Sequence, residues 1–150
     1  MVTGATGNLG VRVVRELSGQ LAPHRLVATA LRPGRSVGRV PVRSLDLRDG
    51  SAVVAAVRSL RPDVIIHLGA VASVHRAEAA PIQALTVNAL GTDALAGVAD
   101  EVGSTVVLAS TDFVFDGQDG DYREGDVATP VNAYGRTKQL AELALDGDRH

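Results

Sequence analysis

The chain of 150 residues has no cysteine, no tryptophan and few aromatic residues, which make up 3% of it. Without cysteine it has neither a disulfide framework nor thiolate chemistry. No apolar stretch approaches the roughly 20 residues that a membrane-spanning helix requires, and no signal peptide precedes the glycine-rich segment at residues 3–10. We therefore expect a cytoplasmic protein with no membrane partner, whose core is packed mainly from alanine, valine and leucine.

Charge argues against further classes of partner. The formal net charge is −2, with 15 Lys and Arg residues against 17 Asp and Glu residues. That balance gives no reason to expect nucleic acid or an anionic membrane surface as a partner. Without cysteines or a paired carboxylate motif, no metal site is expected either, and His67 and His75 are interpreted as structural.

What the sequence does contain is a regular alternation of apolar strands and helical patterns. Strands are predicted at 26–31, 40–45, 63–68 and 105–109, and helices at 9–20, 50–60, 81–102 and 131–145. Such alternation predicts an α/β protein with a parallel, doubly wound sheet of the Rossmann type. The polar segment 111–130 is long for a loop in a compact domain, which favours a functional role.

A glycine-rich loop opens the first predicted helix. Residues 3–10 read TGATGNLG, with glycines at every third position. Glycines let the backbone turn tightly beside a pyrophosphate, and a helix N-terminus offers its free N–H groups to that anion. The candidate cofactor-binding residues of this loop are Gly4, Thr6, Gly7, Asn8, Leu9 and Gly10.

Tyr134 and Lys138 are the most informative pair in the chain. They are four residues apart in a helical pattern, so both side chains lie on one helix face. A nearby ammonium is expected to lower the pKa of the phenol and fit it for proton transfer. Thr111 follows the predicted strand 105–109, where a hydroxyl faces the ligand crevice of such a sheet.

Together these motifs resemble the extended short-chain dehydrogenase/reductases, and more narrowly their dTDP-4-dehydrorhamnose reductase branch. The resemblance rests on TGATGNLG, on STDFVFDG at 110–117, and on the stretch 122–142 with YGRTK and Glu142. Ala77-Glu78 with Pro81, followed by Val87-Asn88-Ala89, adds to it. The chain departs from the pattern of the branch at Val71, Ala72 and His75.

The resemblance implies a reaction and roles for named residues. The family reduces the 4-keto group of a dTDP-4-keto-6-deoxy sugar, a nucleotide-sugar substrate, in dTDP-rhamnose biosynthesis. It implies that Tyr134 donates the proton, that Lys138 tunes it and holds the nicotinamide ribose, and that Thr111 orients the substrate. Asp112 and Asn88 are implied near the substrate. The cofactor side is implied to include Asp46 and Leu47 at the adenine, and Leu68, Gly69 and Ala70 along the dinucleotide.

The segment after the predicted strand 26–31 bears on the choice of cofactor. An Asp or Glu that would select NAD by holding the ribose 2′-OH is absent there, and Arg32 and Arg35 stand in the region. Guanidinium groups suit a 2′-phosphate, so NADP(H) is predicted, with NAD(H) as the alternative.

The same resemblance leads us to expect only part of a longer enzyme. Three residues precede the first glycine, so we expect a truncated first strand, and residues 1–150 would form a partial NAD(P)-binding domain without the C-terminal substrate lobe. Alone, this piece is expected to be inactive, and its parent could be a homodimer. Two alternatives stay open: a nucleotide-sugar epimerase or dehydratase of the same superfamily, and a non-catalytic regulatory subunit with this fold.

Overall fold

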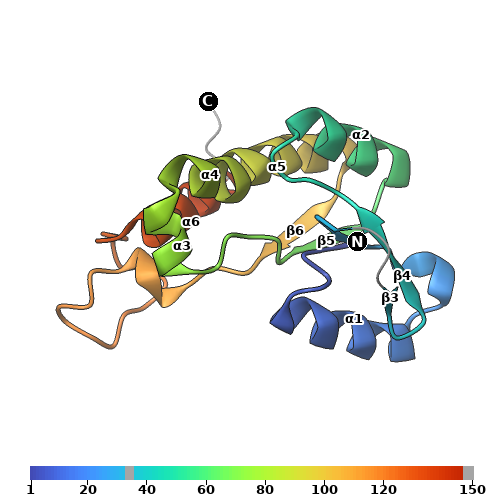
Figure 1. Cartoon of the computed structure of the whole chain (residues 1–150), viewed down its shortest axis with the longest axis horizontal. Coiled ribbons are helices and arrows are strands. Elements are labelled where there is room, and N and C mark those ends of the chain that lie inside the picture. Colours follow the sequence, from blue (N-terminus) through green and yellow to red (C-terminus); the bar gives the residue numbers. More distant parts are fainter. Residues whose placement is uncertain (33–35, 147–150) are drawn as a thin grey trace.

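A computed structural model of the protein describes residues 1–32 and 36–146. Its centre is a sheet with the strand order β3-β4-β2-β1-β5-β6 (Figure 1). All neighbouring strands are parallel except β3 and β4, which pair antiparallel at one edge. The strands are β1 (Val2–Thr3), β2 (Ala28–Ala30), β3 (Ser36–Val37), β4 (Val40–Ser44), β5 (Val64–His67) and β6 (Thr105–Leu108).

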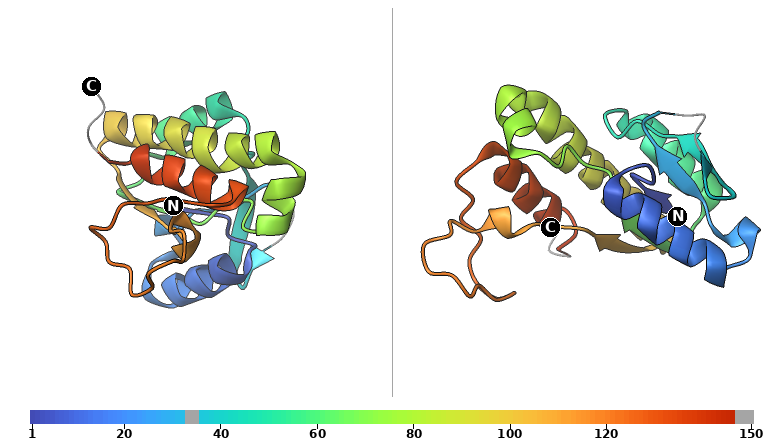
Figure 2. Two further views of the ribbon diagram at one scale, coloured as in Figure 1. Left: turned by 90° about the vertical axis from the view of Figure 1, so that its left-hand side faces the viewer. Right: turned by 60° about the horizontal axis from the view of Figure 1, so that its bottom comes forward.

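Helices cover both faces of this sheet (Figure 2). On one face, α1 (Asn8–Gln20) packs its valines on β1, β2 and β4. On the other, α2 (Gly50–Leu60) and α5 (Gly91–Val102) pack against Leu45 and Ile65. The remaining helical segments are η1 (Pro23–Arg25), α3 (Val74–Ala79), α4 (Pro81–Leu85), η2 (Thr86–Leu90), η3 (Asp112–Val114) and α6 (Ala133–Leu143). The predicted doubly wound parallel sheet is confirmed.

The two-residue strand β1 lies at the centre of the sheet. Val2 pairs with Ala28 of β2 and with Ile66 of β5, and Thr3 pairs with His67. The Met1 ammonium donates a hydrogen bond of 2.7 Å to the Val64 carbonyl. Burial lowers the pKa of this ammonium, while the charge of Asp63 acts in the opposite direction. Even this short strand therefore connects the two halves of the sheet.

Local capping explains where the best-predicted helix begins and ends. The predicted helix 50–60 matches α2. This helix begins at Gly50 because the Asp49 side chain caps it, accepting a hydrogen bond of 2.9 Å from the Ala52 amide. It ends at Arg61, which takes a left-handed conformation with φ of 41°.

The predicted helix 81–102 is instead three segments, because a π-helical turn, η2, separates α4 from α5. The short elements α3, β3, η1 and η3 were not predicted.

Candidate functional site

A cleft of about 320 Å³ opens at the carboxyl ends of β1, β2, β4 and β5. In doubly wound sheets this is where ligands bind, at the point where the strand order reverses. The cleft brings together four strand ends that are far apart in the sequence: the glycine loop after β1, residues 29–31 at the end of β2, residues 45–48 after β4, and residues 68–71 after β5. Of the predicted cofactor residues it is lined by Gly4, Thr6, Gly7, Asp46, Leu47, Leu68, Gly69 and Ala70.

The glycine loop turns close to the segment after β5. Gly4 has a φ of 65°, and a Cβ atom placed on it would lie 2.6 Å from the Gly69 amide nitrogen. Only glycine fits such an approach. The helix α1 then begins at Asn8 with Gly7 as its N-cap and no capping side chain, which leaves its first amides available to an anion.

Other predicted cofactor residues lie outside the lining of the cleft. Among the described residues, Asn8, Leu9 and Gly10 form the first turn of α1, where Gly10 is buried, and Arg32 is exposed after β2. Arg35 lies outside the described residues. Leu47, which lines the cleft, is largely buried because Gly69 and Gly91 both approach it closely.

A buried histidine network supports the floor of this cleft. Thr92 donates its hydroxyl hydrogen to the Asn88 carbonyl at 2.6 Å, so its oxygen accepts from Nε2 of His67 at 3.0 Å. Nδ1 of His67 must then be the unprotonated nitrogen, and it accepts from the Thr3 hydroxyl at 2.7 Å. The Thr3 oxygen in turn accepts from the Leu68 and Gly69 amides. Burial, with the charge of Lys138 as a second cause, lowers the pKa of His67 to about 4.

The second part of the site is built at the start of α6. Asn132 caps this helix by accepting a hydrogen bond of 2.8 Å from the Gly135 amide, and Glu78 of α3 accepts one of 2.6 Å from the Ala133 amide. Gly135 lets the helix approach η3, because a Cβ atom there would lie 2.0 Å from the Phe113 carbonyl oxygen. These contacts hold Tyr134, the second residue of α6, against the Phe113 ring.

The electrostatics of Tyr134 differ from the prediction. Burial raises the pKa of Tyr134, the Thr111 hydrogen bond lowers it, and the charge of Asp112 raises it. Lys138 is not among these causes, so the predicted lowering by the ammonium is wrong for this structure. Lys138 is itself buried, which lowers its pKa, and the charge of Glu142 opposes that shift.

Asn88 lies behind the site. Its side chain is 1% exposed, accepts a hydrogen bond of 2.7 Å from the Val71 amide, and donates to the Val71 carbonyl. It also donates to the Thr137 hydroxyl at 2.9 Å. These contacts favour a positioning role for Asn88 over the predicted contact with substrate.

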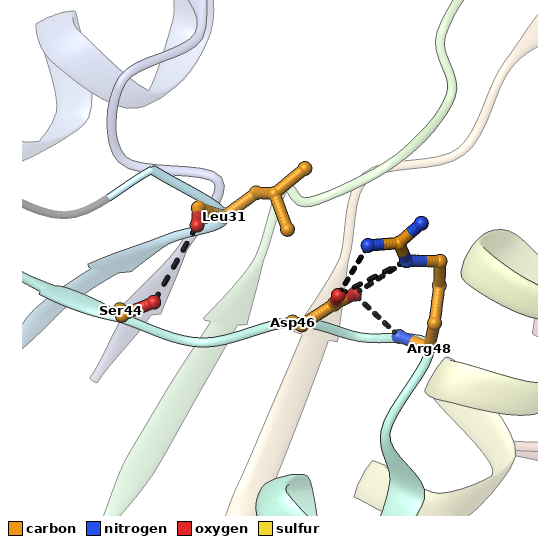
Figure 3. Close-up of polar contacts among 4 residues, drawn as sticks. All are labelled: Leu31, Ser44, Asp46 and Arg48. Atoms are coloured by element: carbon orange, nitrogen blue, oxygen red, sulfur yellow. Dashed lines mark hydrogen bonds and ion pairs between the residues drawn. The ribbon is translucent and has the colours of Figure 1, made fainter.

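Several polar residues near the site were not singled out as functional from the sequence. Arg48, Arg76 and Gln83 line the cleft, and Ser110 donates a hydrogen bond to Glu142 of α6. Arg48 is held by Asp46 (Figure 3). Ser110 and Glu142 belong to the quoted stretches 110–117 and 122–142, but no spacing motif marks Arg48, Arg76 and Gln83.

Two findings bear on other kinds of site. Among residues 1–32 and 36–146, no three His, Asp or Glu side chains gather in a way that could hold a metal ion. No helix in that same part of the chain is long and apolar enough to cross a membrane.

Comparison with known proteins places this fold and site in a family. The family model described as "RmlD substrate binding domain" matches residues 1–149, and the chain belongs to that family. The chain is 37% identical over 149 residues to the methionine adenosyltransferase 2 subunit beta of Xenopus laevis, covering 99% of this chain and 41% of that protein. It is also 37% identical over 147 residues to the dTDP-4-dehydrorhamnose reductase of Salmonella typhimurium, covering 97% of this chain and 46% of that protein. The chain thus spans less than half the length of these relatives.

Solved structures agree on the fold. A dTDP-4-dehydrorhamnose reductase from Bacillus anthracis, in complex with NADP, superposes with a TM-score of 0.77 at 29% identity, over 96% of this chain and 47% of that chain. MoeE5, in complex with UDP-glucuronic acid and NAD, gives a TM-score of 0.82 at 30% identity, over 96% of this chain and 47% of that chain. Both therefore share the architecture described above.

Proposed function

We propose that the chain carries the dinucleotide cleft and the proton donor of an NADPH-dependent reductase. In the whole protein this reductase acts on the 4-keto group of a dTDP-4-keto-6-deoxy sugar, in dTDP-rhamnose biosynthesis. The observation that carries the proposal is the packing of Tyr134, at the start of α6, against Phe113 of η3, together with a glycine-lined cleft at the carboxyl ends of the strands. The reductase relative and the NADP-bound solved structure support it.

The residues of the cleft fit a dinucleotide. Gly4 has no side chain, so the glycine loop can turn close to the segment after β5. The start of α1 has no capping side chain, so its backbone amides can bind a pyrophosphate. A bound NADPH supplies a hydride to the carbonyl carbon of the substrate. Arg32, exposed after β2, is proposed to favour the 2′-phosphate.

Tyr134 is proposed to donate its phenolic proton to the substrate oxygen as the carbonyl becomes an alcohol. Because burial raises the pKa of Tyr134, the phenol is protonated at neutral pH, as a proton donor must be. Thr111 is proposed to hold the same oxygen. Lys138 is proposed to hold the nicotinamide ribose, and solvent returns the proton to the phenolate that remains.

Replacing the proton donor tests this assignment. In the whole protein, Tyr134→Phe should lower turnover of a 4-keto sugar nucleotide by about 10²–10⁴-fold, the usual contribution of general acid catalysis, while NADPH binding stays unchanged. Tyr122→Phe changes the other tyrosine of the chain and serves as the control, with turnover near that of the parent. Turnover of Tyr134→Phe at the parent rate would show that another group supplies the proton.

A second candidate function follows from the other relative. The protein named methionine adenosyltransferase 2 subunit beta is as similar to this chain as the reductase is, so a subunit without its own reductase activity is the alternative. A whole protein that binds NADPH but reduces no 4-keto sugar nucleotide, even with Tyr134 intact, would favour this alternative. An epimerase or dehydratase would instead convert a nucleotide sugar with no net consumption of dinucleotide.

A further inference from the structure

We propose that Glu142 is a positioning residue of the site: its carboxylate, held by the Ser110 hydroxyl, is the counter-charge that supports the Lys138 ammonium without contacting it. The inference rests on the proposed reductase function, in which Lys138 holds the nicotinamide ribose. Glu142 lies in the stretch that carries the family resemblance, but no role is implied for it there.

Lys138 is a buried cation that depends on a counter-charge. It is the only lysine of the chain, and it lies on α6 one turn before Glu142, on the same helix face. Burial lowers the pKa of Lys138, and the charge of Glu142 opposes this shift. An ammonium offers three hydrogen-bond donors, and hydrogen bonds from a charged donor are about twice as strong as those between neutral groups. Firm binding of the ribose therefore requires that the charge on Lys138 be maintained.

The Ser110 hydroxyl holds the Glu142 carboxylate at the end of β6. It donates a hydrogen bond to Oε1 of Glu142 from the position just before Thr111. Among the described residues, no ion pair joins Lys138 to Glu142. The carboxylate thus acts on Lys138 through space, and the donors of the ammonium stay available to a ligand.

Glu142 is unfavourably placed for the helix itself. It lies in the last turn of α6, which ends at Leu143, and the negative end of the helix dipole disfavours a carboxylate there. A pair with the lysine before the glutamate is also the weaker order along a helix. The stability of α6 therefore does not explain this residue, whereas a role at Lys138 does.

The other titratable groups around α6 do not supply the counter-charge. His67 of β5 has a pKa of about 4 and is neutral at pH 7. Glu78 of α3 is bonded to a backbone amide of α6, and the charge of Asp112 of η3 acts on Tyr134. The segments α4 and η2, which also pack against α6, carry no charged residue. None of these groups is among the causes that shift the pKa of Lys138.

NMR titration tests the proposal on the chain itself, because its single lysine gives one side-chain signal when isotope-labelled lysine is supplied. Glu142→Gln removes the charge but keeps an acceptor for Ser110, and it should lower the pKa of Lys138 further. Ser110→Ala leaves the charge in place, so its shift should be smaller. Glu124→Gln is the matched control, because Glu124 lines the same hollow as Glu142 but does not act on Lys138. An unchanged pKa in Glu142→Gln, or an equal shift in Glu124→Gln, would overturn the proposal.

Melting and binding measurements separate this role from a structural one. Glu142→Gln removes an unfavourable charge from the end of α6, so the melting temperature should stay the same or rise. Its affinity for NADPH should equal that of the parent at low pH and be lost at a lower pH than in the parent as the pH rises. A clear fall in melting temperature with an unchanged binding profile would make Glu142 a structural residue. If the pKa shifts as expected but the whole protein reduces no 4-keto sugar nucleotide, the counter-charge stands and the proposed reductase function fails.

Discussion

The Asn88 side chain donates a hydrogen bond of 2.9 Å to the Thr137 hydroxyl, and Thr137 donates to the Tyr134 carbonyl at 2.8 Å. The same Asn88 side chain accepts a hydrogen bond from the Val71 amide and donates one to the Val71 carbonyl, and Val71 lines the cleft. A single buried amide thus connects the cleft wall with the helix that carries Tyr134. The position of the cleft wall relative to Tyr134 depends on this contact.

Replacing Asn88 should therefore lower stability and disturb the site together. Asn88→Ala leaves the Val71 amide and the Thr137 hydroxyl without their partner, and each buried group left unpaired costs about 1–3 kcal/mol. We expect the free energy of unfolding, measured with urea, to fall by about 2–4 kcal/mol. Asn8→Ala, at an exposed asparagine of α1, is the control and should change it by less than about 0.5 kcal/mol. A small effect at Asn88 would mean that water replaces the amide.

Two glycines in helices should respond in opposite directions to alanine. At Gly135 a Cβ atom would lie 2.0 Å from the Phe113 carbonyl oxygen, whereas at Gly19 of α1 nothing lies within 4 Å. Gly19→Ala should raise the free energy of unfolding by about 0.5–1 kcal/mol through helix propensity. Gly135→Ala should lower it by about 1–3 kcal/mol, the usual range for overpacking, and move Tyr134 away from Thr111. If Gly19→Ala and Gly135→Ala changed the melting temperature equally, α6 would be able to move away from η3 at no cost in stability.

Much of the fold follows from the sequence, because its signals are local. The apolar strands and the glycine loop are read directly, and the predicted helix 50–60 has the same bounds as α2. The π-helical turn around Asn88 could not be read in this way, since its side chain bonds to Val71 and Thr137 from other segments. A six-residue helix such as α3 also lies below the length at which periodicity is informative.

The electrostatics of the predicted site residues could not be read from the sequence. The spacing of Tyr134 and Lys138 predicted a shared helix, and both lie on α6. It did not predict that burial would dominate the pKa of Tyr134, because burial depends on α3 and α4 packing around it. The Arg48–Asp46 pair depends on the turn after β4, which spacing does not define.

The pH dependence of stability should carry a signature of His67. Its pKa is lowered from 6.5 to about 4 in the folded protein, so above pH 6.5 neither state binds the proton and stability is complete. As the pH falls from 6.5 to 4, the unfolded chain takes up the proton first, and the free energy of unfolding should fall by about 3 kcal/mol. His67→Gln should lose this part of the acid dependence, whereas His75→Gln, at an exposed histidine, should retain it. Parallel profiles for the parent and His67→Gln in urea titrations would contradict the assignment.

Cofactor preference gives the last prediction. Arg32 is exposed after β2, near the end of the cleft formed by Thr29, Ala30 and Leu31, and no acid stands at 28–35. We expect NADPH to bind more tightly than NADH, because a guanidinium attracts the 2′-phosphate. Arg32→Ala should reduce the ratio of the two affinities by about three- to tenfold, at the scale of a charge-assisted hydrogen bond, with NADH affinity unchanged. Arg43→Ala, at an exposed arginine of β4, is the control in these fluorescence titrations. Equal affinities for the two cofactors in the parent, or an unchanged ratio in Arg32→Ala, would show that selection for the 2′-phosphate does not act through Arg32.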